Sequence, residues 1–292
     1  GSEGTLGFIA DIVWNTVPFG RKHTTAFFRF PTLRTAAAAV PGLNEAGAQA
    51  VELLDAASIH SVAGVKGVPE WMANLPADAA DAAVLTEVRA DDETELDDFE
   101  RKAHAVVDDV KVSGEFTHDA AESAAYWKAR SGLLATVGAA RPMGTALITE
   151  DVCVPPADLA DACEDLEELL VKHGFAGAVN GHASAGNMHF YLYLDSTDPE
   201  NVKTYRAFME DLVALIADKY HGSLKGEHGT GRNIAPYVVR EWGEKAVDLM
   251  WRVKRMLDPD GILGPGVFLN TDPDVTYKNL KSKPNVAPDL EP

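Results

Sequence analysis

The feature that most restricts the fold of this chain is a pair of strand-like segments, 175–180 and 187–194, joined by a short turn at 181–186. Aromatic and other apolar side chains recur in both segments, and glycines begin and end the turn. Because so few residues separate them, the two strands can pair only as an antiparallel hairpin; a parallel pair needs a long crossover. This part of the chain therefore predicts an antiparallel sheet.

Strand-like and helix-like segments alternate along the rest of the chain. Strands are predicted at 8–14, 24–30, 50–54, 83–89 and 146–154. Apolar residues at helical spacing predict helices at 31–40, 92–110, 120–135, 157–172, 198–220 and 236–257. Alternation of this kind, with hairpin-like pairs, predicts the α+β class, in which helices cover an antiparallel sheet.

The chain is strongly acidic, with 45 Asp and Glu residues, 26 Lys and Arg residues and a formal charge of −19. Such a surface argues against nucleic-acid backbones and anionic membranes as partners. Cys153 and Cys163 are too few for a disulfide framework and suggest a reducing compartment. We expect a cytoplasmic protein, and leave open both an attachment to the inner face of the cell membrane and a homo-oligomeric state.

Two glycine-rich segments, GHASAGNMHF at 181–190 and KGEHGTGR at 225–232, carry most of the chemistry. His182 ends the first strand or begins the predicted turn, and His189 lies on the strand that follows, so both imidazoles can reach one ion. Glu227 adds an oxygen ligand, and two histidines with one carboxylate suit zinc, manganese or iron. His228 is expected to point away from that ion, because neighbours in an extended segment face opposite sides. It is then free to act as a general base near neutral pH.

Residue types alone leave other readings open. His182 and His189 could equally be ordinary surface or core histidines. Arg130, on a predicted helix, is either a solvated arginine or a clamp for a substrate carboxylate, which a planar guanidinium suits. Weaker candidates for the same clamp are Arg141, Lys225 and Arg232.

The order of these motifs resembles the C-terminal part of the FAD-linked oxidases of the D-lactate dehydrogenase and glycolate oxidase subunit type. GHASAGNMH at 181–189 resembles that family's GHxxDGNLH motif, and GEHGTG at 226–231 resembles its GEHGxG motif. LDPDGILGPG at 257–266 resembles the closing LDPxGILNPG, and GSEGTLG at 1–7 resembles a segment near the end of the family's FAD-binding domain. The matches extend from residue 1 to about Asn270.

The resemblance implies three parts. Residues 1–20 would be the last strands of an FAD-binding domain whose remainder lies upstream. Residues 21–270 would form a ferredoxin-like cap domain that binds the substrate. Residues 271–292 would be a linker or tail, which in longer members leads to an iron–sulfur domain. The chain alone is then expected not to oxidise substrate, because most of the flavin domain is absent from it.

The resemblance also implies a reaction. A D-2-hydroxy acid of the D-lactate, glycolate or D-2-hydroxyglutarate type would be oxidised to the 2-keto acid by hydride transfer to FAD. The electrons would pass on to a quinone, an iron–sulfur domain or another flavoprotein. His228 would take the hydroxyl proton. By the same analogy, a divalent metal such as zinc or manganese would be bound by His182, His189 and Glu227.

The remaining roles also follow from the resemblance. Arg130 and Asn187 would bind the substrate. The residues that approach the flavin would be Ser2, Gly4 and Gly7.

Three positions depart from the family pattern. Ala185 replaces the common aspartate of the first motif, and Gly264 replaces the asparagine of the closing motif. Thr149 stands where some members carry a substrate-binding lysine. These departures bear on which acid is oxidised rather than on the class of reaction. A free-standing metal-dependent hydrolase and a non-catalytic ligand-binding domain remain the alternative readings.

Overall fold

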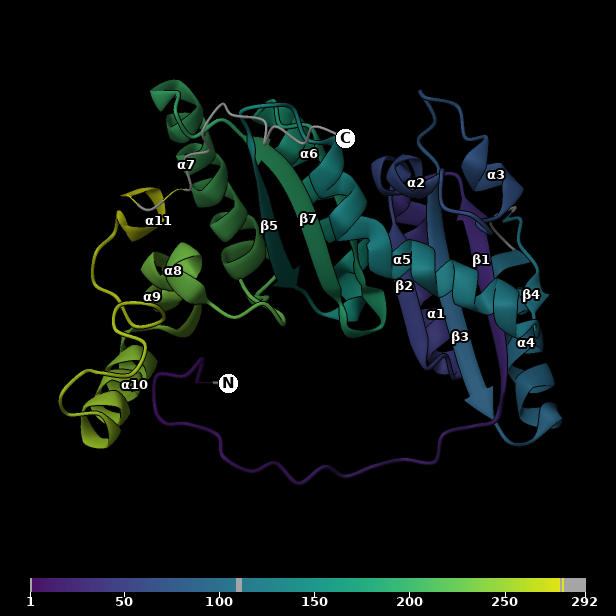
Figure 1. The fold of residues 1–292 in the computed structure, drawn as a ribbon, viewed down its shortest axis with the longest axis horizontal. Coiled ribbons are helices and arrows are strands. Elements are labelled where there is room, and N and C mark those ends of the chain that lie inside the picture. The colour runs from purple at the N-terminus through teal and green to yellow at the C-terminus, as the bar shows by residue number, and fades with distance from the viewer. Residues whose placement is uncertain (1, 109–111, 279, 281–292) are drawn as a thin grey trace, which may run out of the picture.

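The computed structural model describes residues 2–108, 112–278 and 280 of the chain, and it confirms the predicted α+β class. One antiparallel sheet of seven strands runs through the described residues in the order β4-β1-β3-β2-β6-β7-β5 (Figure 1). The strands are β1 Lys22–Phe30, β2 Ala50–Leu54, β3 Ala82–Ala90, β4 Phe116–Thr117, β5 Ala146–Cys153, β6 Gly177–His182 and β7 Asn187–Leu194. The predicted hairpin is β6–β7.

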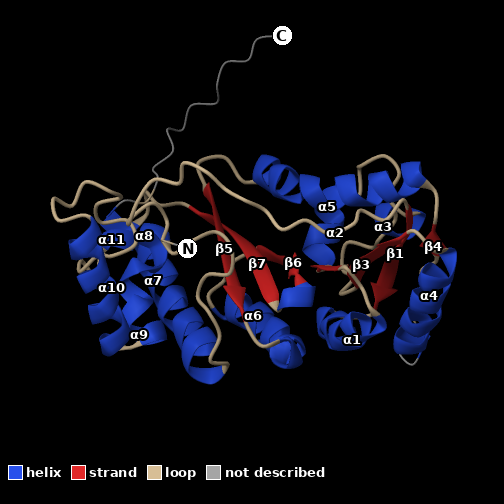
Figure 2. Cartoon of the chain, turned by 90° about the horizontal axis from the view of Figure 1, so that it is seen from below, coloured by secondary structure: helices blue, strands red, loops and turns tan. Residues whose placement is uncertain are grey.

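Helices cover both faces of the sheet. They are α1 Leu33–Ala46, α2 Ala56–Val62, α3 Glu70–Ala73, α4 Glu93–Val107, α5 Ala120–Ala140, α6 Leu159–Lys172 and α7 Pro199–Val213. On one face α1, α4, α6 and α7 form a large apolar core with the strands, while α2, α3 and α5 cover a smaller core on the other (Figure 2). Successive strand residues face opposite sides, which explains how one sheet serves two cores. The helices α2 and α3 were not predicted.

The pairing of β2 with β6 joins the two halves of the sheet and positions the candidate site. Glu52 of β2 stands opposite His182 of β6, and Asn180 of β6 stands opposite His189 of β7. Glu52 shares its side of β2 with Leu54, which belongs to the smaller core. The polar residues at this junction therefore lie on the face that α5 covers.

The C-terminal part is helical. Its elements are a π-helical turn at Ala214–Lys219, then α8 Gly231–Ile234, α9 Val238–Trp242, α10 Glu244–Leu257 and α11 Val275–Lys278. The predicted continuous helix 236–257 is wrong: Gly243, at φ 79°, interrupts it in a conformation that favours glycine. No helix of the described residues has the length and apolarity needed to cross a bilayer.

Residues just beyond the predicted domain end at 270 still pack against the body. The Thr276 hydroxyl donates to the backbone carbonyls of Arg232 and Asn233. The Tyr277 and Tyr237 hydroxyls lie 2.7 Å apart. The rest of the predicted tail, residue 279 and residues 281–292, lies outside the described part.

The predicted strand at 8–14 does not form. The segment crosses from the region of α10 to the start of β1 as extended chain (Figure 1), and within the described residues it joins no sheet. Phe8 and Val13 are 92% and 97% exposed. Its composition suits a strand, but a strand needs a neighbour to supply its ladder of hydrogen bonds.

The start of this N-terminal segment is nevertheless anchored. The Glu3 carboxylate accepts the backbone N–H groups of Thr230 and Gly231 at 2.5 and 3.0 Å. The buried Lys254 ammonium donates to the Thr5 carbonyl at 2.8 Å. The motif at 1–7 is thereby attached to the loop that carries Glu227 and His228. Its first residue, Gly1, is outside the described residues.

Candidate active site

The hairpin β6–β7 brings the two predicted histidine ligands together. His182 ends β6, His189 lies on β7, and their rings meet edge to face with centroids 5.1 Å apart. His189 is almost fully buried, while His182 is partly open. Burial lowers the pKa of His189 to about 4, and the nearby charges of His182 and His228 act in the same direction. The neutral form of His189 is the one that can offer a lone pair to a cation.

Glu227 completes the predicted set from a loop distant in sequence. Its Oε1 lies 3.2 Å from His182 Nε2 and 3.3 Å from His189 Nε2. Backbone hydrogen bonds between Ser223 and Cys153 hold the start of this loop against the end of β5. One ligand atom from each of the three residues lies within 4.8 Å of the others. Two imidazoles, which bind metal in their neutral form, and one carboxylate that converge in this way fit a divalent cation.

His228 joins the same cluster, contrary to the expectation that it would point away from Glu227. Residues 226–228 form bends rather than extended strand, so the two adjacent side chains need not diverge. The His228 ring stacks on His189 with centroids 4.9 Å apart, and its Nε2 lies 3.9 Å from Glu227 Oε1. A third imidazole therefore faces the converging ligand atoms.

Asp151 organises this loop and was not recognised in the sequence. It is fully buried on β5, and its Oδ2 accepts the backbone N–H groups of Glu227 at 2.5 Å and His228 at 3.4 Å. Its Oδ1 lies 3.5 Å from His228 Nδ1. The residues Asp151, His189 and His228 form a second group with converging ligand atoms. One carboxylate oxygen thus holds the backbone of the loop, while the other, Oδ1, lies near the ring of His228 and has no hydrogen-bond partner among the described residues.

Arg130, on α5, is hydrogen-bonded to Glu52, a second carboxylate that was not recognised in the sequence. Arg130 Nε donates to Glu52 Oε2 at 2.8 Å, and the other oxygen, Oε1, lies 2.8 Å from His182 Nδ1. This hydrogen bond to Glu52 raises the pKa of His182 above its ordinary value. Arg130 Nη2 is buried without a hydrogen-bond partner among the described residues. A buried guanidinium donor left open in this way suits an anionic ligand.

Asn187 lies beneath the loop. Its Nδ2 donates to Asp151 Oδ2 at 3.2 Å, while its Oδ1 is buried and has no partner within the described residues. A Cβ on Gly226 would come within 2.2 Å of that Nδ2 and 2.8 Å of Asp151 Oδ2. Only a glycine therefore lets the loop approach β5 and β7 this closely.

The weaker clamp candidates have other partners or positions. Lys225 forms a buried ion pair with Glu150, and burial lowers the pKa of Lys225 to about 8. Arg141 Nη1 donates to the Gly138 carbonyl of its own helix. Arg232 is exposed on α8.

A cavity of about 960 Å³ opens beside the Glu227 loop. Its wall includes Ser2 from the N-terminal segment, Gly226 and Glu227 from the loop, and the apolar side chains Leu249 and Met250 of α10. Of the other residues predicted to approach a flavin, Gly4 and Gly7 are exposed. A large, partly apolar space next to the ligand cluster could accept a sizeable cofactor or substrate.

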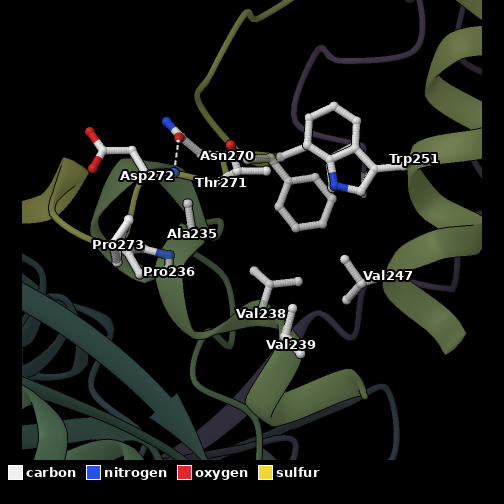
Figure 3. Close-up of a pocket in the computed structure, with 12 residues that line it drawn as sticks. Ala235, Pro236, Val238, Val239, Val247, Trp251, Asn270, Thr271, Asp272 and Pro273 are labelled. Atoms are coloured by element: carbon white, nitrogen blue, oxygen red, sulfur yellow. Dashed lines mark hydrogen bonds between the residues drawn. The ribbon is translucent and has the colours of Figure 1, made fainter. Parts of the chain in front are cut away.

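A second pocket of about 290 Å³ is lined by residues of α9, α10 and the segment 268–273 (Figure 3), and it shares Phe268 and Leu269 with the larger cavity. Its walls are mainly apolar, with Val238, Val247 and Trp251 facing it, and no histidine lines it. Of the ligand cluster described above, Glu227 lines the larger cavity instead.

Charged residues inside apolar strands were the sequence signal for the two missed carboxylates. Glu52 lies in AVELL at 50–54, and Asp151 follows Glu150 within the strand 146–153. Acidic side chains are almost never buried unless they are paired, so an acid in a central strand marks a partner. The identity of that partner depends on the tertiary fold.

Comparison with known proteins identifies the family of this chain. The family model described as "FAD linked oxidases, C-terminal domain" matches residues 20–268. D-2-hydroxyglutarate dehydrogenase of Escherichia coli strain K12 is 32% identical over 285 residues, which cover 91% of this chain and 27% of that protein. Mitochondrial D-lactate dehydrogenase [cytochrome] of Kluyveromyces lactis is 28% identical, covering 94% and 47%. Glycolate oxidase subunit GlcD of Bacillus subtilis strain 168 is 26% identical, covering 93% and 56%.

Solved structures share the fold at low identity. 4-Ethylphenol oxidase from Gulosibacter chungangensis superposes with a TM-score of 0.63 at 15% identity, covering 87% of this chain and 55% of that one. An alkyldihydroxyacetonephosphate synthase gives 0.60 at 16% identity, covering 91% and 48%. The chain spans between 27% and 56% of the lengths of the three relatives named above. The match of the family model over most of its residues establishes that this chain belongs to the FAD-linked oxidases, as a C-terminal domain of that family.

Proposed function

We propose that this chain is the substrate- and metal-binding part of an FAD-dependent enzyme that oxidises a D-2-hydroxy acid to the 2-keto acid. The observation that carries the proposal is the convergence of ligand atoms from His182, His189 and Glu227, with the His228 ring stacked on His189. Arg130, which has an open donor, is joined to His182 through Glu52, and Glu227 also lines the large cavity. The names of the relatives, which are D-2-hydroxyglutarate and D-lactate dehydrogenases and a glycolate oxidase subunit, support the same substrate class.

The proposed ligands of a divalent ion such as zinc or manganese are His182 Nε2, His189 Nε2 and Glu227. These atoms already lie close together, and burial keeps His189 neutral, as binding requires. When bound, the ion would make the substrate hydroxyl more acidic. The exposed side of Glu227 leaves room for the substrate to approach.

His228 is the proposed proton acceptor. Asp151 Oδ1 faces its Nδ1, which favours a proton on Nδ1 and leaves the Nε2 lone pair available. In the reaction the O–H proton goes to His228 Nε2, the C–H bond breaks with its electron pair, and the carbonyl forms. FAD, when bound, would accept that hydride.

Arg130 is the proposed partner of the substrate carboxylate. Its Nε is already engaged by Glu52, so the buried Nη2 remains for an anion. Asn187 is a proposed second contact with the substrate; its unpartnered Oδ1 only accepts hydrogen bonds, so it would meet a donor of the substrate rather than the carboxylate. Thr149 occupies the position where some family members have a substrate-binding lysine, and the panel of acids below distinguishes among D-lactate, glycolate and D-2-hydroxyglutarate as the substrate.

We further propose that the flavin domain lies mainly in sequence outside this chain and that residues 1–20 belong to it. The exposed apolar side chains of 8–19 then have a strand partner in that domain. Ser2 lines the cavity beside Glu227, as a flavin contact should, and Gly4 and Gly7 belong to the same proposal. A quinone, an iron–sulfur domain or a second flavoprotein would take up the electrons.

Stopped-flow flavin reduction tests the proposal. The complete flavin-containing protein is mixed anaerobically with D-lactate, glycolate, D-2-hydroxyglutarate and L-lactate. We expect rapid bleaching of the oxidised flavin by at least one of the first three acids. Absence of reduction by every one of them, in a protein with full flavin and metal content, would contradict it.

A further inference from the structure

One buried carboxylate holds both the proposed metal ligand His182 and the proposed substrate clamp Arg130. Glu52 Oε1 lies 2.8 Å from His182 Nδ1, and Glu52 Oε2 accepts from Arg130 Nε at 2.8 Å. The side chains of Glu52 and Arg130 are only 8% and 11% exposed. Because charged groups lose their hydration when they are buried, both oxygens of Glu52 need these partners.

The sheet fixes Glu52 in this position. Glu52 is the direct partner of His182 across the β2–β6 seam, and it pairs with Leu85 on its other side in β3. Its neighbours Leu53 and Leu54 are buried in the larger and the smaller core respectively. A strand held from both sides and both faces cannot shift to relieve an unsatisfied carboxylate.

The chemistry of the carboxylate decides how His182 is oriented. An ionised carboxylate only accepts hydrogen bonds, so His182 must present Nδ1–H to it. The Nε2 lone pair then points to the side where Glu227 Oε1 lies 3.2 Å away. The same carboxylate takes up Arg130 Nε–H and leaves the buried Nη2 of the guanidinium for another anion.

We propose that Glu52 is a positioning residue that sets the tautomer of His182 and the orientation of Arg130, and so couples metal binding to recognition of the substrate carboxylate. This inference rests on the proposed function. Carboxylates that hold a ligating histidine in this way typically contribute about 10–100-fold to metal affinity or activity. Here the same group also serves the residue that would bind the substrate.

Glu52→Gln is the direct test. A glutamine has one acceptor and one donor end, so it can satisfy either His182 Nδ1–H or Arg130 Nε–H but not both. We expect the dissociation constant for Zn²⁺ or Mn²⁺, measured by competition with a chromophoric chelator, to rise about 10–100-fold, or the KM for the hydroxy acid to rise by a similar factor. Unchanged metal affinity and unchanged KM in a folded variant would overturn the inference.

Glu87→Gln provides a matched control. Glu87 is a buried glutamate of β3, and it accepts from Thr25, Ser123 and Trp127 rather than from the histidines. It should lower the midpoint of urea unfolding without changing metal affinity or KM. Equal losses of metal affinity in both variants would mean that burial of any acid in this sheet matters, and would overturn the specific role of Glu52.

A measurement on the unaltered protein covers the case in which Glu52→Gln does not fold. ¹⁵N shifts of the histidine rings in the metal-loaded protein distinguish the two tautomers. We expect His182 to carry its proton on Nδ1 and to bind through Nε2; binding through Nδ1 would overturn the inference. If the unaltered protein binds neither metal nor hydroxy acid, the proposed function itself fails. This outcome differs from that of a Glu52→Gln variant with unchanged metal affinity and KM, which overturns only the role of Glu52.

Discussion

Replacing Asp151 by asparagine should separate the two tasks of this carboxylate. Asp151 Oδ2 accepts two backbone N–H groups, from Glu227 and His228, and Oδ1 faces His228 Nδ1. Hydrogen bonds to a charged acceptor contribute about 1.5–3 kcal/mol each, against about 0.5–1.5 kcal/mol for a neutral one. For two backbone donors the variant should therefore lose about 2–3 kcal/mol of unfolding free energy.

The effect on the reaction should be larger. The asparagine oxygen can keep accepting from the backbone, and its NH₂ then faces His228 Nδ1. A donor at that point makes Nδ1 the acceptor and places the ring proton on Nε2, where the substrate proton should go. Since a positioned base contributes typically about 10²–10⁴-fold, flavin reduction should slow by a factor in that range. Single-turnover stopped-flow at saturating substrate measures it, with urea unfolding in parallel.

Asp55→Asn is a control for the loss of a buried carboxylate that accepts hydrogen bonds from backbone N–H groups. Asp55 accepts the N–H groups of Ser58 and Val179 at 2.7 Å each, outside the site. It should cost stability without slowing flavin reduction. An Asp151→Asn variant that folds, binds metal and reduces its flavin at the unaltered rate would refute this role of Asp151.

Two further predictions concern packing and pH. Gly226→Ala should lower the free energy of unfolding by about 1–3 kcal/mol and weaken metal binding, because its Cβ would overlap Asn187. The control Gly132→Ala, in open space on α5, should raise the free energy of unfolding by about 0.5–1 kcal/mol in the same urea assay. A Gly226→Ala variant with unaltered stability and metal binding would contradict the close approach of the loop. Burial raises the pKa of Glu167 to about 7, and the charge of Asp55 acts in the same direction. Between the ordinary pKa of a glutamate and this raised value, the folded state keeps a proton that the unfolded state has lost. The free energy of unfolding should therefore fall as the pH rises from about 4.5 to 7. Glu167→Gln should therefore raise the free energy of unfolding by about 1 kcal/mol at pH 8, after allowance for its partial exposure, and leave it unchanged at pH 4. The exposed control Glu168→Gln should show no such difference between the two pH values. An equal gain for Glu167→Gln at both pH values would refute the prediction.

The sequence predicted the parts of the fold that local pattern determines. The strands 50–54 and 187–194 begin and end as expected: the first is a short, mainly apolar run, and the second is rich in aromatic side chains. The strand at 8–14 failed because strand formation depends on a neighbour, not on composition alone. The helix 236–257 failed at Gly243, whose left-handed backbone breaks a pattern that is otherwise periodic.

The candidate site divides in the same way. His182 and His189 could be paired from sequence because a short turn joins their strands. Their contact with Glu227 depends on the bridge between Ser223 and Cys153, which only the tertiary fold supplies. Glu52 and Asp151 lie on strands that are far in sequence from the two glycine-rich motifs, and the motifs alone do not predict their hydrogen bonds. The direction of His228 was mispredicted because the bends at 226–228 were read as extended chain.

The most direct test of the central claim is the rate of flavin reduction by a D-2-hydroxy acid in the complete protein carrying His228→Ala, compared at equal metal and flavin content with the unaltered protein. If His228 accepts the hydroxyl proton, the rate of the single turnover should fall by about 10²–10⁴-fold while metal affinity changes little. A variant that reduces its flavin at the unaltered rate would remove His228 from the chemistry and contradict the account of the site.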